Sequence, residues 1–341
     1  MIRVGIIGAG RIGKVHTESI ATKVNNAKVA AIADPFINDD TVRWAKSFGI
    51  EKCVRNYKDI LKDKNIDAVL ICSSTDTHSA ISIDAIKAGK HVFCEKPVDH
   101  DVEKIKKVMD ALKGGKVKYQ VGFNRRFDHN FMAAKDAVDS GKIGEMNILK
   151  ITSRDPAPPP IEYIKVSGGL FLDMAIHDFD MVRYISGTEV EEIFAYGANL
   201  VDPKIGQAVD IDTAIISMRL SNGALAVIDN CRRSSYGYDQ RLEVFGSLGQ
   251  IAIGNDTQAN YELSTADGVT SGKPLHFFLE RYMDAYAKEI RMFIDSIVND
   301  TDTPAGIKDG LMDVVVGLAA KESLATKAPV KINVILKRYG L

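Results

Sequence analysis

The sequence has few cysteines, almost no net charge and no long apolar run. It holds 4 cysteines, and 44 Lys and Arg against 45 Asp and Glu give a net charge of −1. The four cysteines show no paired spacing, so in a chain of this length they imply no disulfide framework. The basic residues are scattered, which excludes a basic stripe that would bind nucleic acid. No run approaches the roughly 18 apolar residues of a membrane span. No cleavable signal pattern precedes the first strand. We therefore expect a globular protein of a reducing cytoplasm that binds neither nucleic acid nor membrane.

Two domains are expected from the length of the chain and its apolar content. A chain of 341 residues, 45% of them hydrophobic, can bury two separate cores. Up to residue 122, apolar runs alternate with helical stretches, which indicates a parallel sheet with helices on both faces. Residues 1–122 are therefore expected to form a doubly wound α/β domain of the Rossmann type. Its strands are predicted at residues 2–7, 28–34, 67–72, 90–95 and 118–122, and its helices at 11–24, 37–48, 77–88 and 102–113.

The pattern changes after Phe123. Ser221-Asn222-Gly223 separates two alternating runs and predicts a hairpin turn between them. Residues 123–341 are expected to form an α+β domain with an open, mostly antiparallel sheet, whose last helices could pack back on the first domain. Its strands are predicted at residues 146–153, 191–198, 212–220, 224–230, 240–245 and 250–253, and its helices at 128–140, 169–185, 279–298 and 308–326.

The run Ala224–Ile228 is apolar on both faces of its predicted strand. One face can pack on the helices of its own domain, and the other must also be covered, because large exposed apolar patches are rare on monomers. We infer that the open face of this sheet is an oligomer interface. The alternative is that loops of the same chain cover it.

A glycine-rich turn, Gly8-Ala9-Gly10-Arg11-Ile12-Gly13, follows the first strand and opens a helix. Gly8 permits a tight turn, Gly10 lets the backbone approach phosphates, and Gly13 lets the helix pack on the strand. The helix N-terminus offers N–H groups and a positive dipole end to a pyrophosphate. The alternative is an ordinary strand–helix turn, but Asp34, about 20 residues further on, completes the fingerprint of a dinucleotide site.

Asp34 is expected to accept hydrogen bonds from ribose hydroxyls of that dinucleotide. A 2′-phosphate would meet its carboxylate as a like charge, and the next residues, Pro35 and Phe36, supply no arginine, so the sequence predicts NAD rather than NADP. His78 could lie at the same edge, but a histidine at a helix start is more often a cap or a surface residue. The full predicted cofactor set is Gly8, Gly10, Arg11, Ile12, Gly13, Asp34, Ser73, Ser74, Thr75, Glu95 and Lys96.

Two further motifs carry groups for acid–base chemistry. Glu95-Lys96-Pro97 places a lysine at the end of a later strand of the parallel sheet, and Asp173 and His177 lie four residues apart in a predicted helix. That spacing predicts that they share one helix face, where the carboxylate can orient and support the imidazole. The alternatives are a surface or capping pair and a zinc site. No second cluster of His, Cys or carboxylate at ligand spacing supports a metal.

Four motifs together resemble the glucose–fructose oxidoreductase / inositol dehydrogenase family, and the similarity covers essentially the whole chain. The resemblance implies a Rossmann domain, a substrate domain whose open sheet mediates a homotetramer, and Lys96, Asp173 and His177 as the catalytic set. It also implies that Pro97 follows a cis peptide bond. The motifs are the glycine turn, Val92-Phe93-Cys94-Glu95-Lys96-Pro97, Gly122-Phe123-Asn124-Arg125-Arg126-Phe127-Asp128 and the run from Gly169 to Asp180.

The same resemblance implies which residues hold a polyol substrate. Lys96, Asp173 and His177 would contact it, and Arg125, Asp155 and Tyr238 match positions that hold cyclitol hydroxyls, with Asn124 and Ser153 nearby. The alternative for Arg125 and for Arg126 is a phosphate contact or a structural ion pair. This chain has Ser153-Arg154-Asp155-Pro156 where well-studied members carry His-Arg-Asn-Pro, a difference that concerns the preferred stereoisomer.

The activity implied by the family is NAD-dependent oxidation of a cyclic polyol, with myo-inositol and its 2-keto product as the expected pair. His177 is expected to remove the hydroxyl proton, and Lys96 to donate to the same oxygen. Three alternatives remain open: a pyranose dehydrogenase, an NAD-assisted glycosidase, and a sugar-sensing regulator without catalysis. Both Lys96 and His177 are present, which argues against the regulator.

Overall fold

The computed structural model describes residues 1–341, which divide into two compact units. Unit 1 comprises Met1–Phe127 and Met283–Val314, and unit 2 comprises Asp128–Tyr282 and Val315–Leu341. Residues 123–127 and 283–314 thus group with the N-terminal part of the chain. Helix α13 (Ile307–Thr326) passes from one unit to the other. No helix of the chain is both long enough and apolar enough to span a bilayer.

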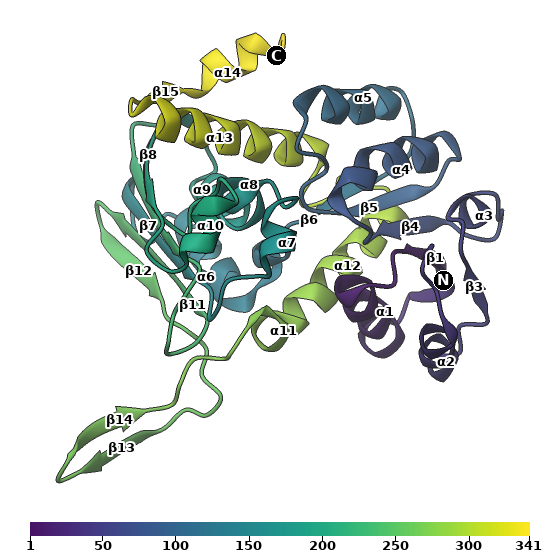
Figure 1. Cartoon of the computed structure of the whole chain (residues 1–341), viewed down its shortest axis with the longest axis horizontal. Coiled ribbons are helices and arrows are strands. Elements are labelled where there is room, and N and C mark those ends of the chain that lie inside the picture. Colours follow the sequence, from purple (N-terminus) through teal and green to yellow (C-terminus); the bar gives the residue numbers. More distant parts are fainter. The chain divides into compact units, whose positions relative to one another are not determined.

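Unit 1 is built on a six-stranded sheet in the order β3-β2-β1-β4-β5-β6, with every pairing parallel (Figure 1). This confirms the predicted doubly wound sheet. Its elements are β1 (Ile2–Ile7), α1 (Arg11–Lys23), β2 (Ala27–Ala33), α2 (Asp39–Ser47), β3 (Lys52–Val54), α3 (Lys58–Leu61), β4 (Ala68–Ile71), α4 (Thr75–Lys87), β5 (His91–Glu95), α5 (Val102–Leu112), β6 (Tyr119–Gly122), η1 (Asn124–Phe127) and α12 (Met283–Asn299).

Two helices of unit 1 begin two residues away from their predicted starts. Helix α2 starts two residues later than predicted because the side chain of Asn38 accepts a hydrogen bond from the backbone N–H of Thr41. Helix α4 starts two residues earlier, with Ser74 in extended conformation at its N-cap. Strand β3 and helix α3 were not predicted, because elements of three or four residues carry too little periodic pattern.

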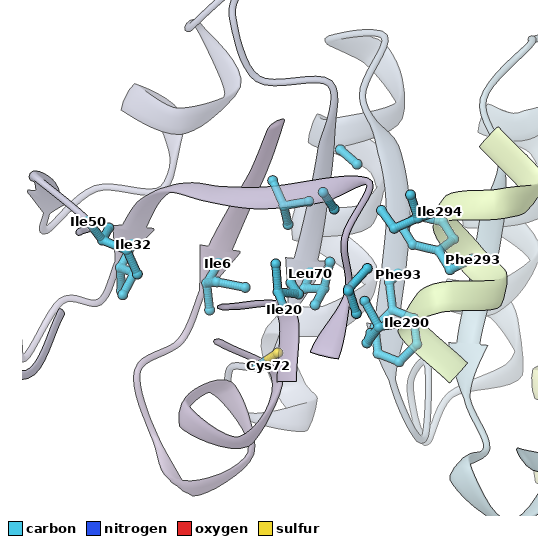
Figure 2. Packing of buried hydrophobic residues seen from close by; sticks show 14 of the residues in the cluster. Ile6, Ile20, Ile32, Ile50, Leu70, Cys72, Phe93, Ile290, Phe293 and Ile294 are labelled. Carbon is cyan, nitrogen blue, oxygen red and sulfur yellow. The ribbon is translucent and has the colours of Figure 1, made fainter. Parts of the chain in front are cut away.

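The core of unit 1 includes a helix from far along the chain. Successive residues of β4 are all buried, so side chains on both faces of the sheet are covered. Figure 2 shows Phe93 of β5 beside Ile290 and Phe293 of α12, and Ile6 and Leu70 of the sheet belong to the same buried cluster. This packing explains why residues 283–314 belong to unit 1.

Unit 2 is built on a seven-stranded sheet in the order β12-β11-β7-β10-β9-β8-β15, in which the β7–β10 pair alone is parallel (Figure 1). The predicted open, mostly antiparallel sheet is confirmed. Its elements are α6 (His129–Asp139), β7 (Met146–Arg154), α7 (Ile161–Ile164), α8 (Gly169–Asp173), α9 (Ile176–Ser186), β8 (Val190–Ala198), α10 (Pro203–Gln207), β9 (Thr213–Leu220), β10 (Leu225–Cys231), β11 (Asp239–Gly246), β12 (Gly249–Ile253), β13 (Glu262–Thr265), β14 (Gly268–Ser271), α11 (Phe278–Arg281), β15 (Val330–Lys331) and α14 (Ile332–Arg338).

The predicted hairpin turn between β9 and β10 is confirmed. The N–H of Gly223 donates to the carbonyl oxygen of Leu220 at 2.9 Å, and Gly223 has φ +88. That left-handed conformation favours glycine over residues with a side chain. The turn sets the register in which Leu225 lies opposite Arg219.

Two predicted long helices are broken, and one break falls between two of the predicted catalytic residues. The helix expected at 169–185 is α8 followed by α9, because the Ala175 N–H reaches back five residues to Leu170 and the His177 N–H only three to Met174. The prediction of one continuous helix through Asp173 and His177 was therefore wrong, since Asp173 ends α8 and His177 lies in the first turn of α9. The helix expected at 279–298 is likewise α11 and α12, which belong to different units.

One face of the sheet in unit 2 carries exposed apolar side chains. Directly paired residues lie on the same face, and the pairings Leu225–Ile148, Phe245–Ile148 and Tyr196–Ile215 join five residues that are 36% to 67% exposed. We call this surface the open face. Loops of this chain do not cover it.

The same unit extends the β13–β14 hairpin (Figure 1), which was not predicted because its strand residues are all exposed and lack apolar alternation.

Candidate active site

The glycine turn has the geometry that a dinucleotide seat needs. Gly8 has φ +102, and a Cβ there would lie 2.6 Å from the backbone of Cys72; a Cβ on Gly13 would lie 2.0 Å from the carbonyl oxygen of Gly8. A Cβ on Gly10 would meet nothing within 4 Å, and no side chain caps α1. Gly8 and Gly13 are therefore required by the fold, whereas Gly10, with Arg11 and Ile12 after it, leaves room for a phosphate at the helix N-terminus.

Asp34 lies at the carboxyl end of β2 and holds the glycine turn in place. Its Oδ2 accepts from the N–H of Ala9 at 2.7 Å, and its Oδ1 accepts from the N–H of Phe36 at 2.8 Å. Each carboxylate oxygen can accept a second bond, so Asp34 can still hold ribose hydroxyls. The carboxylate is thus part of both the turn and the predicted ribose site.

Ser73, Ser74 and Thr75 follow β4 at the same edge of the sheet, where Ser73 Oγ lies 2.7 Å from Thr77 Oγ1. His78, next in α4, is 2% exposed, so the expectation of a cap or surface residue was wrong. Its Nδ1 lies 2.8 Å from the carbonyl oxygen of Pro97 and its Nε2 3.0 Å from that of Ser73. Carbonyl oxygens only accept, so both nitrogens must donate and the ring is an imidazolium.

The electrostatics of His78 agree with that assignment. Burial alone would lower its pKa, but interactions with Cys94 and with the carbonyl groups of Pro97 and Ser73 raise the pKa to about 9. A cationic His78 therefore joins the loop after β4 to the residue that follows Lys96.

Lys96 and the η1 residues start from neighbouring strand ends. Glu95 pairs with Gly122 in the parallel ladder of β5 and β6, so Lys96 and Asn124 follow the same edge. The Lys96–Pro97 bond is cis, as the family resemblance implies. Lys96 is half-buried, while Asn124 and Arg125 are 3% and 4% exposed.

Arg126 has a structural role in unit 1. Its Nη2 lies 3.0 Å from Asp309 Oδ1, and its Nη1 donates to the carbonyl oxygen of Pro304 at 2.8 Å. The structural ion pair that the sequence left open for the two arginines is therefore found for Arg126.

Asp173 ends α8 in unit 2 and has two partners that the sequence did not predict. Its Oδ1 accepts from the Tyr163 hydroxyl at 2.8 Å, and its Oδ2 lies 3.2 Å from Nη2 of Arg232, which is 1% exposed. A buried guanidinium needs a carboxylate partner, so the pair fixes Asp173. The only sequence signal was a charged residue directly after the apolar strand β10.

His177 lies half-buried in the first turn of α9. The next residue, Asp178, is fully buried, and its Oδ2 accepts from Asn230 Nδ2 at 2.8 Å. The same amide lies 3.3 Å from the carbonyl oxygen of Ser153. Asn230 thus fastens the start of α9, and with it His177, to strands β7 and β10.

The other predicted substrate residues of unit 2 lie at or near the ends of its strands. Ser153 is fully buried and exchanges hydrogen bonds with the side-chain amide of Gln240. The N–H of Asp155 donates to the carbonyl oxygen of Cys231 at 2.9 Å. Tyr238, directly before β11, is 7% exposed and packs edge-on against Phe277 and Tyr282, with ring centroids 5.7 and 5.9 Å apart. Ser153 and Asp155 therefore lie at the carboxyl end of β7, and the two aromatic neighbours hold the ring of Tyr238 in place.

Comparisons with known proteins identify the class. Residues 2–123 match the oxidoreductase family with an NAD-binding Rossmann fold, and residues 131–252 match the GFO/IDH/MocA C-terminal domain. The chain belongs to this glucose–fructose oxidoreductase / inositol dehydrogenase family. It is an NAD-dependent oxidoreductase, and the open cradle at Gly10 together with Asp34 fits that cofactor.

Particular relatives align over nearly their full length. The chain is 47% identical to the myo-inositol 2-dehydrogenase of Thermotoga maritima, over 98% of this chain and 100% of that one. It is 44% identical to the inositol 2-dehydrogenase of Rhizobium meliloti, over 97% and 99%. The solved scyllo-inositol dehydrogenase from Lactobacillus casei, with bound NAD(H) and scyllo-inositol, superposes with a TM-score of 0.90 at 32% identity, over 98% and 99%.

Proposed function

We propose that this chain oxidises myo-inositol to 2-keto-myo-inositol with NAD as the acceptor. The observation that carries the proposal is the 47% identity, over 98% of this chain and 100% of the relative, to a protein named for that activity. The retained Lys96, Asp173 and His177 support it, because together they supply a cation, a carboxylate and a proton acceptor.

The proposed mechanism assigns one task to each of these side chains. NAD, when bound, supplies the acceptor for the hydride that leaves the ring carbon. His177, as the neutral imidazole, takes the hydroxyl proton as the carbonyl forms. The ammonium group of Lys96 donates to the same oxygen and stabilises the negative charge that develops on it. Asp173, fixed by Arg232 and Tyr163, stabilises the imidazolium that results.

The proposed substrate contacts suit an uncharged ring of hydroxyl groups. Arg125 and Asn124 at η1, and Ser153, Asp155 and Tyr238 in unit 2, offer both donors and acceptors. A site built on hydrogen bonds to hydroxyl groups rejects analogues that lack them. We therefore expect deoxy-inositols to be poor substrates.

An NADH-production screen over inositol isomers and aldohexoses tests the function. We expect the highest kcat/KM with myo-inositol, and net NADH formed with the free polyol. Turnover of a glycoside without net NADH would replace the proposal with the glycosidase mechanism. Tight sugar binding with no NADH formed would replace the proposed activity with that of a sugar-sensing regulator.

The main rival substrate is scyllo-inositol, since a relative of 32% identity was solved with that isomer. Ser153 and Asp155, where well-studied members carry His and Asn, are the positions proposed to decide between the two isomers. Exchanging them for His and Asn should change the ratio of kcat/KM for the two isomers while leaving the NAD KM in place.

The preference for NAD over NADP is proposed to rest on Asp34. Replacing Asp34 with Ala should lower kcat/KM for NAD about 10- to 100-fold, because a charge-assisted hydrogen bond contributes about 1.5–3 kcal/mol, and should narrow the preference over NADP. Asp34→Asn, which keeps one acceptor oxygen for the turn, separates charge from turn geometry. An unchanged ratio of kcat/KM for the two cofactors would refute the assignment.

We further propose a homotetramer assembled through the open face, with residues 1–122 as the NAD-binding domain and residues 123–341 as the substrate and oligomerisation domain. Within this second segment, residues 123–127 and 283–314 group with unit 1. The exposed apolar residues of the open face support the interface. A monomer in light scattering at micromolar concentration would refute it. A cytoplasmic location is also proposed, and the four free cysteines support it.

A further inference from the structure

Unit 1 holds a buried cluster of three ionisable side chains that the proposed mechanism does not use. His16 comes from α1, Glu95 from the end of β5 and Glu289 from α12. His16 and Glu289 are 0% exposed and Glu95 is 9% exposed. One nitrogen or oxygen atom from each residue lies within 4.8 Å of the other two. Three separate elements therefore converge on one polar point inside an apolar core.

His16 and Glu95 are directly bonded. His16 Nε2 lies 2.6 Å from Glu95 Oε1, and the rings of Phe93 and Tyr286 pack edge-on against the imidazole, with centroids 5.2 and 5.7 Å away. The second oxygen of Glu95 is confined by Gly122, where an added Cβ would lie 3.1 Å from it. Little space remains for the Glu95 carboxyl to move.

Glu289 has no partner for either carboxyl oxygen, although its backbone carbonyl accepts from Gln120 Nε2 at 3.1 Å. Burial, and then the charge of Glu95, raise the pKa of Glu289 well above its usual range. Burial and the nearby acidic groups also raise the pKa of the Cys72 thiol, so Cys72 stays neutral and gives Glu289 no counter-charge. A buried carboxylate without a cation or donor is far too costly, so Glu289 holds a proton.

A metal ion fits this cluster less well than a proton does. Two donors on one tetrahedral ion at about 2.1 Å lie roughly 3.4 Å apart. The 2.6 Å between His16 Nε2 and Glu95 Oε1 is instead the length of a charge-assisted hydrogen bond.

We propose that His16, ionised Glu95 and protonated Glu289 form a positioning unit that holds Lys96 in register with the glycine turn. Glu95 is the residue directly before Lys96, and His16 lies one turn into the helix that opens at Gly10. Their bond joins the two parts of the cofactor site inside unit 1, and neutral Glu289 packs behind it without adding a second negative charge. The role of Lys96 in this inference rests on the proposed function, whereas the proton on Glu289 does not.

The first test exchanges Glu289 for Gln, which has the shape of the neutral acid. If the acid is protonated, Glu289→Gln keeps kcat within about twofold of the wild type. The infrared C=O band of a protonated carboxyl, present in the wild type, disappears in this variant and persists in Asp284→Asn, a surface control on the same helix. A band absent from the wild type would overturn the proposal. So would one equivalent of metal in the purified protein.

The second test removes the bond to Glu95. Replacing His16 with Leu should lower kcat by on the order of 10²-fold, since a misplacement of about 1 Å can cost that much, with the KM for inositol little changed. His16→Gln, whose amide can still donate, should recover part of the loss. Equal loss in both variants would show only a packing role and would overturn the proposal. If no polyol is oxidised by the wild type, the proposed function fails, while the infrared result still decides the state of Glu289.

Discussion

The parallel sheet of unit 1 is buried on both faces, whereas the sheet of unit 2 leaves apolar side chains exposed on one face. All four residues of β4 are buried, but alternate residues of β9 are exposed. Unit 1 can therefore present chemistry only at the carboxyl edge of its sheet, where the glycine turn, Ser73 and Lys96 lie. Unit 2 has both a polar edge, where the proposed substrate residues lie, and an exposed apolar surface, which is the proposed interface between copies of the chain.

The two units also differ in how they hold their functional side chains. In unit 1 the backbone does much of the holding, through Gly8, Gly13 and the Asp34 bonds to backbone N–H groups. In unit 2 side chains hold side chains, as Arg232 and Tyr163 hold Asp173. The difference suits a shared cofactor in the first case and a particular substrate in the second.

The largest expected effect separates catalysis in unit 2 from cofactor binding in unit 1. His177→Ala should lower kcat by about 10²–10⁴-fold, while the Kd for NAD stays at the wild-type value. His276→Ala, an exposed histidine of the same unit, is the control and should leave kcat unchanged. A His177→Ala enzyme with near wild-type kcat would show that the base is another group.

The next effect concerns the stability of unit 1. The pKa of His78 is raised to about 9 in the folded protein, so its contribution is complete below pH 6.5 and is lost as the pH rises from 6.5 to about 9. The shift corresponds to about 3 kcal/mol. Urea unfolding of wild type and His78→Gln from pH 6 to 9.5 should show a difference in stability that shrinks over this range. A difference independent of pH would contradict the cationic assignment.

A smaller effect distinguishes two glycines of the same turn. Gly13→Ala forces a Cβ to within 2.0 Å of a backbone oxygen and should destabilise the fold by about 1–3 kcal/mol. Gly10→Ala meets nothing within 4 Å, so thermal unfolding should be unchanged while the Kd for NAD rises. Equal destabilisation by both changes would mean that Gly10 also serves the fold.

The smallest effect on the stability of a single chain is expected at the open face. Ile215→Lys changes a side chain that is 48% exposed, and such surface changes usually alter stability by less than about 0.5 kcal/mol. Size-exclusion chromatography with light scattering should nevertheless show smaller particles. Lys150→Gln, a polar change on the same face, is the control. An unchanged particle mass for Ile215→Lys would place the interface elsewhere.

Most of the fold could be predicted, because long apolar runs and long helices carry strong periodic patterns. The break between α8 and α9 could not, since Met174 and Ala175 include neither Pro nor Gly. The exposed β13–β14 hairpin lacks the alternation that marks a half-buried strand. At the site, the glycine turn has a fixed local sequence and was found. The partners of Asp173 were not, because Tyr163 and Arg232 come together with it only in three dimensions.

The single parallel ladder of unit 2 pairs β7 with β10 and places Cys231 opposite Arg154, so the residues that follow these two strands lie at the same edge of the sheet. Reversing the direction of β10 would carry Arg232 to the far rim of the sheet and leave Asp173 without its counter-ion. A circular permutant or a redesigned β9–β10 loop that changes how β10 enters the sheet would therefore remove the ion pair of Asp173, even if every strand remained in the sheet.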